Sequence, residues 1–178
     1  MMTENKSCVS TKRIALIFLR YNMDIITLNK SLSLLLETEK KIKKRTEKYI
    51  ELCDSSLLFQ FTNEDETKKL ELSKLTSFTS KLVENIGSTD AYIAKISSYI
   101  CISDNEMNND MTLFLTTIFD KYTYWKSAAK AFILNTERLF KDNEKIKYSL
   151  LLSEAKVFDS ATEAFCTVIS DIINKIKI

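Results

Sequence analysis

A chain of 178 residues is long enough to bury one hydrophobic core, and its 45% apolar and 28% charged residues are typical of a folded domain. The formal net charge of +2 lacks the basic excess of a dedicated nucleic-acid binder, so we expect no nucleic-acid partner. The chain has no histidine and one glycine, which argues against histidine-based catalysis and glycine-rich phosphate loops, so we expect no enzyme, cofactor, metal site or small-molecule substrate.

Residues 1–10 are polar and lack the apolar core of a signal peptide, so we expect a disordered leader followed by a single helical domain at residues 11–178. The apolar run at residues 14–19 is short, whereas a helix that spans a bilayer needs about twenty apolar residues. The cysteines form no CxxC pair, and we expect them to be reduced thiols of a cytoplasmic protein. They are Cys8, Cys53, Cys101 and Cys166.

The longest pattern in the sequence is a ladder of apolar residues whose steps alternate between three and four. A mean step of about 3.5 residues is typical of helices that pack lengthwise in coiled-coil-like bundles. It predicts a first helix from near Thr11 to about Leu58. Glu39 and Thr46 occupy two consecutive core positions, where they either fix the register of the helix or mark where it leaves the bundle. The apolar members are Ile14, Phe18, Tyr21, Ile25, Leu28, Leu32, Leu35, Ile42, Tyr49 and Cys53.

Two polar tracts predict the first turns. Residues 62–66 combine asparagine with acidic residues that favour a helix N-terminus, and residues 103–110 are rich in capping and turn residues. Between these tracts the ladder from Leu72 to Ile100 predicts a second helix. Gly87 lies within this helix, and we expect it to be tolerated because the apolar phase continues across it.

A third helix is predicted from Met111 onward, and its apolar register nearly continues to Ile176. The polar residues around 141–149 favour a bend or a break over one uninterrupted helix. The sequence therefore predicts an all-α fold, an elongated antiparallel bundle of three to four long helices with coiled-coil-like packing.

The third helix is rich in aromatic residues, which fall into two sets. Phe114, Tyr122, Trp125 and Phe132 lie near the seam and are predicted to be core. Phe119, Tyr124 and Phe140 lie off it. This second apolar stripe indicates that the helix contacts two neighbours or that the chain pairs with another copy.

A basic cluster is the strongest charge feature. Because Ile42 occupies the seam, the cations around it are expected on the exposed side of the helix, where they could bind anionic lipid headgroups. The cluster consists of Lys40, Lys41, Lys43, Lys44, Arg45 and Lys48, and a smaller candidate group consists of Lys141, Lys145 and Lys147. The alternative interpretation is a solvated face on which Glu37, Glu39 and Glu47 neutralise the cations.

Two segments carry a resemblance to a known family. Residues 35–50 include an E-x-x-I-K-K-R-x-E-K pattern, and the run at 113–140 spaces Tyr124, Ala128 and Arg138 like a recurring tyrosine, small residue and arginine. On these features the stretch from Leu34 to Lys147 resembles the helical half of sorting nexins of the BAR type. The resemblance implies a curved antiparallel homo- or hetero-dimer, formed through helical faces, whose basic residues bind endosomal membranes.

Two functions remain open from the sequence. The first is a non-enzymatic, BAR-like membrane-trafficking scaffold that is cytoplasmic and peripheral on anionic endosomal membranes. The second is a helical protein–protein interaction module without lipid binding, such as a spectrin-like or syntaxin-N-terminal-like bundle or a pathogen factor that engages a host protein.

Overall fold

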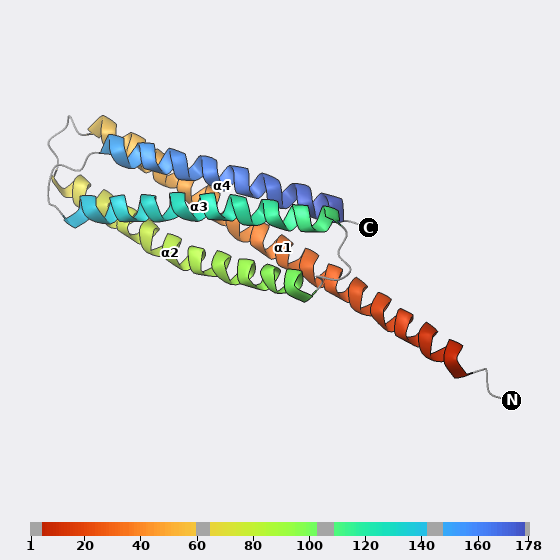
Figure 1. Cartoon of the computed structure of the whole chain (residues 1–178). Helices are drawn as coiled ribbons and strands as arrows, with labels where there is room; N and C mark the ends of the chain where they lie inside the picture. Colours follow the sequence, from red (N-terminus) through yellow and green to blue (C-terminus); the bar gives the residue numbers. More distant parts are fainter. Residues whose placement is uncertain (1–4, 60–64, 103–108, 142–147, 177–178) are drawn as a thin grey trace.

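The computed structural model shows four long helices in the residues that it describes (Figure 1). Helix α1 spans Asn5–Phe59, α2 spans Asp65–Ile102, α3 spans Asn109–Lys141 and α4 spans Tyr148–Ile176. The structure describes residues 5–59, 65–102, 109–141 and 148–176, with side chains at 25–54, 73–98 except 75, 113–138 and 149–176. Successive helices run antiparallel, so the predicted all-α antiparallel bundle is confirmed.

The helices form a ring in which each one has two neighbours. Helix α1 packs against α2 and α4, and α3 packs closely against α4 and more loosely against α2. The alternation of direction along the chain is that of an up-down-up-down four-helix bundle (Figure 1). This arrangement explains why the apolar residues of α3 occupy more than one stripe.

The N-terminal boundary of the bundle differs from the prediction. Helix α1 begins at Asn5, not near Thr11, so residues 5–10 of the expected disordered leader are helical. This stretch contains neither proline nor glycine, so no residue in it opposes extension of the helix toward the N-terminus. Residues 1–4 lie outside the described residues.

The predicted break near 141–149 is confirmed, because α3 ends at Lys141 and α4 begins at Tyr148. The tracts predicted as turns fall largely on residues 60–64 and 103–108, which lie outside the described part of the chain. Helix α2 continues through Gly87, and a Cβ atom placed there would meet no other atom within 4 Å. The glycine is therefore tolerated, as predicted.

The apolar ladder of α1 forms one side of the core. In heptad notation its members occupy the a and d positions, and these are buried from Leu28 to Cys53. Glu39 and Thr46 are buried a positions as well, so α1 stays in the bundle where they occur. Of the two interpretations offered by the sequence, departure of the helix from the bundle at these residues is wrong.

Aromatic rings fill the centre of the bundle. Phe132 of α3 is fully buried, stacks on Phe158 of α4 with ring centroids 5.7 Å apart, and meets Tyr49 of α1 edge-on at 5.1 Å. The buried indole N–H of Trp125 donates a hydrogen bond to Thr162 Oγ1 at 3.1 Å. The contacts of Phe132 join α1, α3 and α4, and the Trp125 hydrogen bond to Thr162 joins α3 to α4 two turns away and satisfies the one polar group of the indole.

The aromatic residues of α3 divide nearly as predicted. Trp125 and Phe132 are fully buried, and Phe114 and Tyr122 pack against the core while partly exposed. Of the set predicted to lie off the seam, Phe119 also packs against the core, whereas Tyr124 is 57% exposed. The side chain of Phe140 lies outside the described ones.

Helix α1 is longer than the other three and extends past their ends on the side of the N-terminus (Figure 1). Ile25 is the first residue of α1 at which the structure describes packing against the core. We call residues 5–24, which precede it, the α1 projection. At 1.5 Å per residue it is about 30 Å long.

The aromatic centre predicts a large loss of stability on truncation. Changing Phe132 to Ala removes the contacts with Phe158 and Tyr49 and leaves a cavity among fully buried side chains. We expect the free energy of unfolding to fall by roughly 3–5 kcal/mol in urea denaturation. The matched change Tyr124→Ala on the exposed side of α3 should cost less than about 1 kcal/mol. Equal losses in the two variants would contradict the described core.

Candidate functional site

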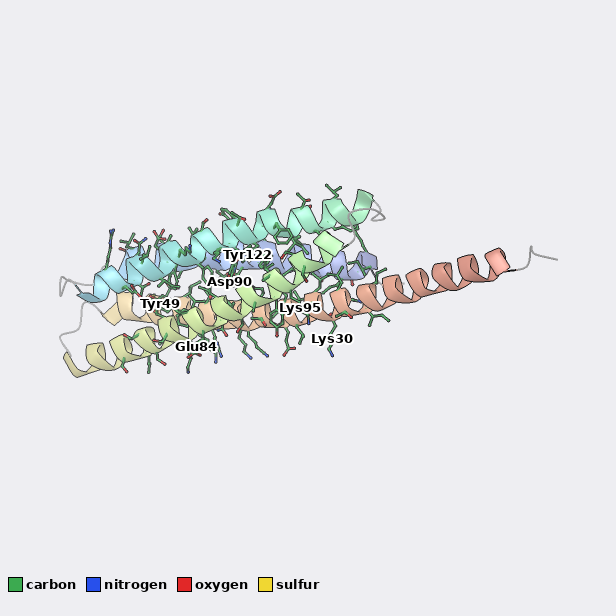
Figure 2. All side chains as sticks on the ribbon, turned by 60° about the horizontal axis from the view of Figure 1, so that its bottom comes forward. Lys30, Tyr49, Glu84, Asp90, Lys95 and Tyr122 are labelled. Carbon is green, nitrogen blue, oxygen red and sulfur yellow. The ribbon has the colours of Figure 1, made fainter. Side chains whose placement is uncertain are left out.

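The outer side of α1 carries a line of exposed lysines. Because the a and d positions face the core, the b, c and f positions face solvent, and Lys30, Lys40 and Lys44 occupy f, b and f. Figure 2 shows Lys30 pointing away from the α3 and α4 side of the bundle. We call this surface the lysine face, and it consists of Lys30, Lys40, Lys41, Lys44 and Lys48, all of which are exposed.

Most of the lysine face is free of intramolecular ion pairs within the described residues. Lys41 is the exception, because its ammonium lies 2.7 Å from Glu37 Oε1 one turn earlier. This hydrogen bond and the Lys41 charge hold the pKa of Glu37 below its ordinary value. Lys30, Lys40, Lys44 and Lys48 make no ion pair within the described residues, so their ammonium groups are accessible to an external anion.

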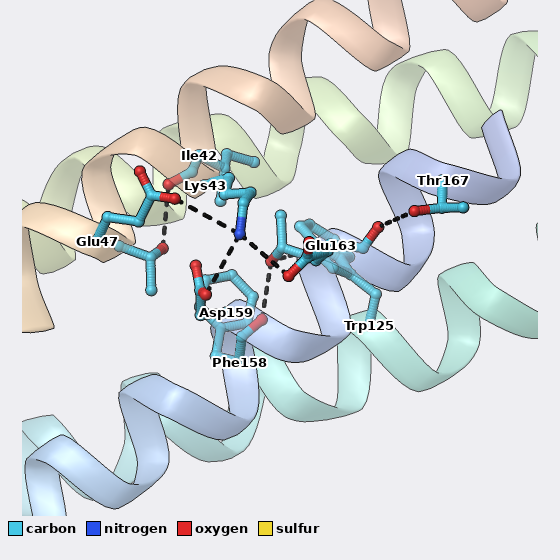
Figure 3. Close-up of polar contacts among 10 residues, drawn as sticks. Ile42, Lys43, Glu47, Trp125, Phe158, Asp159, Glu163 and Thr167 are labelled. Carbon is cyan, nitrogen blue, oxygen red and sulfur yellow. Dashed lines mark hydrogen bonds and ion pairs between the residues drawn. The ribbon is translucent and has the colours of Figure 1, made fainter. Parts of the chain in front are cut away.

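Lys43 belongs to the sequence-predicted cluster but is held between helices (Figure 3). Its ammonium lies 3.4 Å from Asp159 Oδ2 and 3.3 Å from Glu163 Oε2, both on α4, and 3.5 Å from Glu47 Oε1 on α1. Burial lowers the pKa of Lys43, but the Asp159 and Glu163 carboxylates outweigh it and leave the pKa above its ordinary value. The structure thus gives Lys43 a role in holding α1 against α4.

The structure places none of the remaining predicted cations on the exposed lysine face. Arg45 is only half-exposed, at a g position beside the seam. Lys141 is the last residue of α3, and its side chain lies outside the described ones. Lys145 and Lys147 fall within residues 142–147, outside the described part of the chain. The structure therefore brings no second basic group to the lysine face among the side chains that it describes.

Sequence reasoning missed Lys30, which lies ten residues before the contiguous basic run. It occupies the f position two heptads before Lys44, so the heptad register places both on the same side of α1. The signal that could have found it was the spacing along the helix, whereas the basic run drew attention to adjacent residues.

A polar contact crosses the core beneath the lysine face. Glu39 is fully buried, and the Thr89 hydroxyl of α2 donates a hydrogen bond to its Oε1 at 2.5 Å. Glu39 Oε2 has no hydrogen-bond partner among the described residues. Burial raises the pKa of Glu39 to about 8, against the smaller opposing effect of the Thr89 hydrogen bond, so the carboxyl group is largely protonated at neutral pH.

A second polar cluster joins α2 and α3, where the bundle is packed more loosely. The Tyr122 hydroxyl donates to Asp90 Oδ1 at 2.6 Å, and Lys126 Nζ donates to Asp90 Oδ2 at 2.7 Å. Lys126 also donates to the Tyr122 oxygen at 2.8 Å. Burial and the hydrogen bond to Asp90 raise the pKa of Tyr122. The three side chains hydrogen-bond to one another, so we interpret this cluster as a structural contact between α2 and α3 and not as a functional site.

The described residues offer few groups for chemistry. No three histidine, cysteine, aspartate or glutamate side chains among them gather closely enough to hold a metal ion. Cys53 and Cys166 are free thiols, and burial, with the nearby Glu39, raises the pKa of Cys166 to about 11. A thiol with so high a pKa is protonated and weakly nucleophilic at neutral pH. Cys8 and Cys101 lie outside the described side chains.

Comparisons with known proteins give no further assignment. No family model, curated protein or solved structure matches this chain. The likeness to sorting nexins is therefore supported only at the level of an all-helical, four-helix protein. In the part of the chain that the structure describes, none of the helices has the length and apolar character needed to cross a bilayer.

Buried Glu39 predicts a pH-dependent stability. Its pKa of about 8 in the folded state exceeds its ordinary value of 4.5. The folded protein therefore keeps a proton that the unfolded chain releases, and the free energy of unfolding falls as pH rises between these two values. We expect Glu39→Gln to remove this fall and to exceed the wild type in stability at alkaline pH by a few kcal/mol, because each pH unit in this window costs on the order of 1.4 kcal/mol.

Urea denaturation of both proteins across this pH range measures the difference. The matched control is Glu37→Gln, because Glu37 is exposed and lies on the same helix. This variant should follow the wild type closely at alkaline pH. Parallel pH profiles for the wild type and Glu39→Gln would show that Glu39 is ionised in the folded protein and would contradict the assignment.

Proposed function

We propose that this chain is a non-enzymatic helical scaffold that binds anionic membrane surfaces through the lysine face of α1. The observation that carries the proposal is the exposure of Lys30, Lys40, Lys44 and Lys48 on one side of a continuous helix, without intramolecular ion pairs in the described residues. A lysine near an anionic membrane surface contributes about 1 kcal/mol to binding. Four such residues in line can therefore hold the chain to a membrane weakly and reversibly.

The interior of the bundle supports this function by fixing the orientation of α1. The a and d residues from Leu28 to Cys53 are buried, and Lys43 ties the same helix to Asp159 and Glu163 of α4. Helix α1 cannot rotate about its axis without exposing that seam. The lysine face is consequently presented in one direction, which is what a scaffold on a flat or curved surface requires.

The finer features implied by the resemblance belong to the same proposal. A sorting-nexin-type scaffold would be cytoplasmic, peripheral on endosomal membranes and dimeric through its helical faces. The basic composition of the lysine face agrees with such a membrane, because the cytoplasmic leaflet carries anionic lipids.

A protein-interaction module is the second candidate function, and one observation favours it. The four helices of a single chain bury their own aromatic centre, so the fold is complete without a second copy. Tyr124 and Leu134 on α3 and Val157 on α4 remain at least half-exposed and could contact a protein partner. In that case the lysine face would contribute nothing to binding.

Co-sedimentation with vesicles tests the proposed function. Changing Lys40, Lys44 and Lys48 to Glu replaces attraction with repulsion, and we expect binding to phosphatidylserine-containing vesicles to weaken by at least about tenfold. Wild-type binding should also weaken as salt is raised, because exposed charges are screened.

The matched control carries the same charge change on α3 and α4, with Lys121, Lys130 and Lys156 changed to Glu. These lysines are also exposed. The control should bind nearly as well as the wild type. If both variants bind equally, or if the wild type ignores anionic vesicles, the membrane proposal is wrong and the protein-interaction module becomes the better account.

A further inference from the structure

The b, c and f positions of α1, which face away from the seam, differ in polarity between the two ends of the helix. Between residues 30 and 48 the b, c and f positions face solvent and hold the five lysines of the lysine face together with Ser33, Leu34, Glu37 and Glu47. Nearer the N-terminus, all four b and f positions from residue 16 to residue 26 are apolar. These residues are Leu16, Leu19, Met23 and Ile26, and we call them the outer apolar patch.

This pattern is unusual for a bundle helix, whose outer positions are normally polar. The b and f positions lie opposite the seam, which is the side where α2 and α4 pack. Ile26, the one member whose side chain the structure describes, is 68% exposed. The register therefore gives the outer apolar patch no role in the seam of its own bundle.

Cationic residues lie next to the outer apolar patch and also follow it along the helix. Arg13 and Arg20 occupy c positions next to it, and the lysine face continues the same side of the helix from Lys30. From Leu16 to Lys48 the combined surface extends over about 50 Å at 1.5 Å per residue. It is apolar at one end and mainly cationic along the rest, where Glu37 and Glu47 interrupt the lysines, and it follows one side of a continuous helix.

We infer that α1 binds an anionic lipid surface at a tilt, with the outer apolar patch near its N-terminus inserted among the acyl chains and the lysine face against the headgroups. An interfacial helix has this combination of a broad apolar face and flanking lysine or arginine. A lipid surface supplies anionic headgroups with hydrocarbon beneath them, so a helix whose N-terminal part lies deeper than its middle meets both. An arginine side chain, as at positions 13 and 20, is long enough to extend from such a patch to the headgroups.

The inference rests on the proposed function and adds an inserted, apolar component to it. Electrostatic adsorption alone would be lost at high salt, whereas insertion leaves binding that salt does not remove. Insertion would also use the α1 projection, which carries most of the outer apolar patch and extends past the bundle toward the N-terminus (Figure 1).

Fluorescence of an introduced tryptophan in the full chain tests insertion directly. Leu19→Trp should show a blue shift and strong quenching on phosphatidylserine-containing vesicles whose lipids carry brominated acyl chains. The native Trp125 is fully buried in the bundle, so the wild type gives the background signal. Tyr124→Trp on the exposed side of α3 is the matched control and should be quenched no more than the wild type.

Binding measurements separate insertion from adsorption. The double variant Leu16→Gln and Leu19→Gln should bind the same vesicles at least about tenfold more weakly, with its residual binding abolished by salt. If this variant binds like the wild type while the change of Lys40, Lys44 and Lys48 to Glu abolishes binding, the proposed function holds and insertion is refuted.

Two other outcomes also overturn the inference. If the wild type fails to bind anionic vesicles, both proposals fail together. If light scattering shows a dimer of the wild type that the change of Leu16 and Leu19 to Gln dissociates, and no quenching occurs on vesicles, the outer apolar patch is an interface between two copies of the chain. Circular dichroism of each variant confirms that the helices remain.

Discussion

The packing of the a and d residues of α1 against α2 and α4 is the constraint on which the rest of the structure depends. Once Leu32, Leu35 and Ile42 face the core, every other position of this long helix has a fixed direction. The lysines at b, c and f are driven outward for this reason, and the same register assigns Leu16 and Leu19 to outer positions. A surface that is cationic over one stretch and apolar over another follows from the seam.

Polar residues in and beside the seam restrict the register of α1 relative to α2 and α4. Glu39 accepts a hydrogen bond from Thr89 of α2, and Lys43 lies between Asp159 and Glu163 of α4. A shift of α1 by one heptad would bury Glu39 without its hydrogen-bond donor and separate Lys43 from both carboxylates. Buried or half-buried polar contacts of this kind cost stability but favour one register over its neighbours. The direction of the lysine face is thereby fixed more firmly than apolar packing alone would fix it.

The sequence predicted the helices well because helix periodicity is local. The ladder from Leu28 to Cys53 was identified as a buried seam, and the break after Lys141 was placed correctly. The start of α1 was missed because Ser10 and Thr11 are favoured N-cap residues, whereas the helix begins earlier, at Asn5. The partners of Lys43 could not be predicted, since they lie 116 and 120 residues away and meet it only through the packing of α4 against α1. Lys43 was consequently grouped with the exposed cations, and Lys30 was missed outside their run.

We propose that α1 is the membrane-facing helix of this bundle. Hydrogen–deuterium exchange of the full chain, with and without phosphatidylserine-containing vesicles, tests it most directly. We expect the backbone amides of α1 to exchange more slowly on the vesicles, most strongly in the α1 projection, because this part extends past the other helices (Figure 1). Exchange in α3 should be unchanged. Slower exchange confined to α3 and α4, or no change in any helix, would contradict the claim.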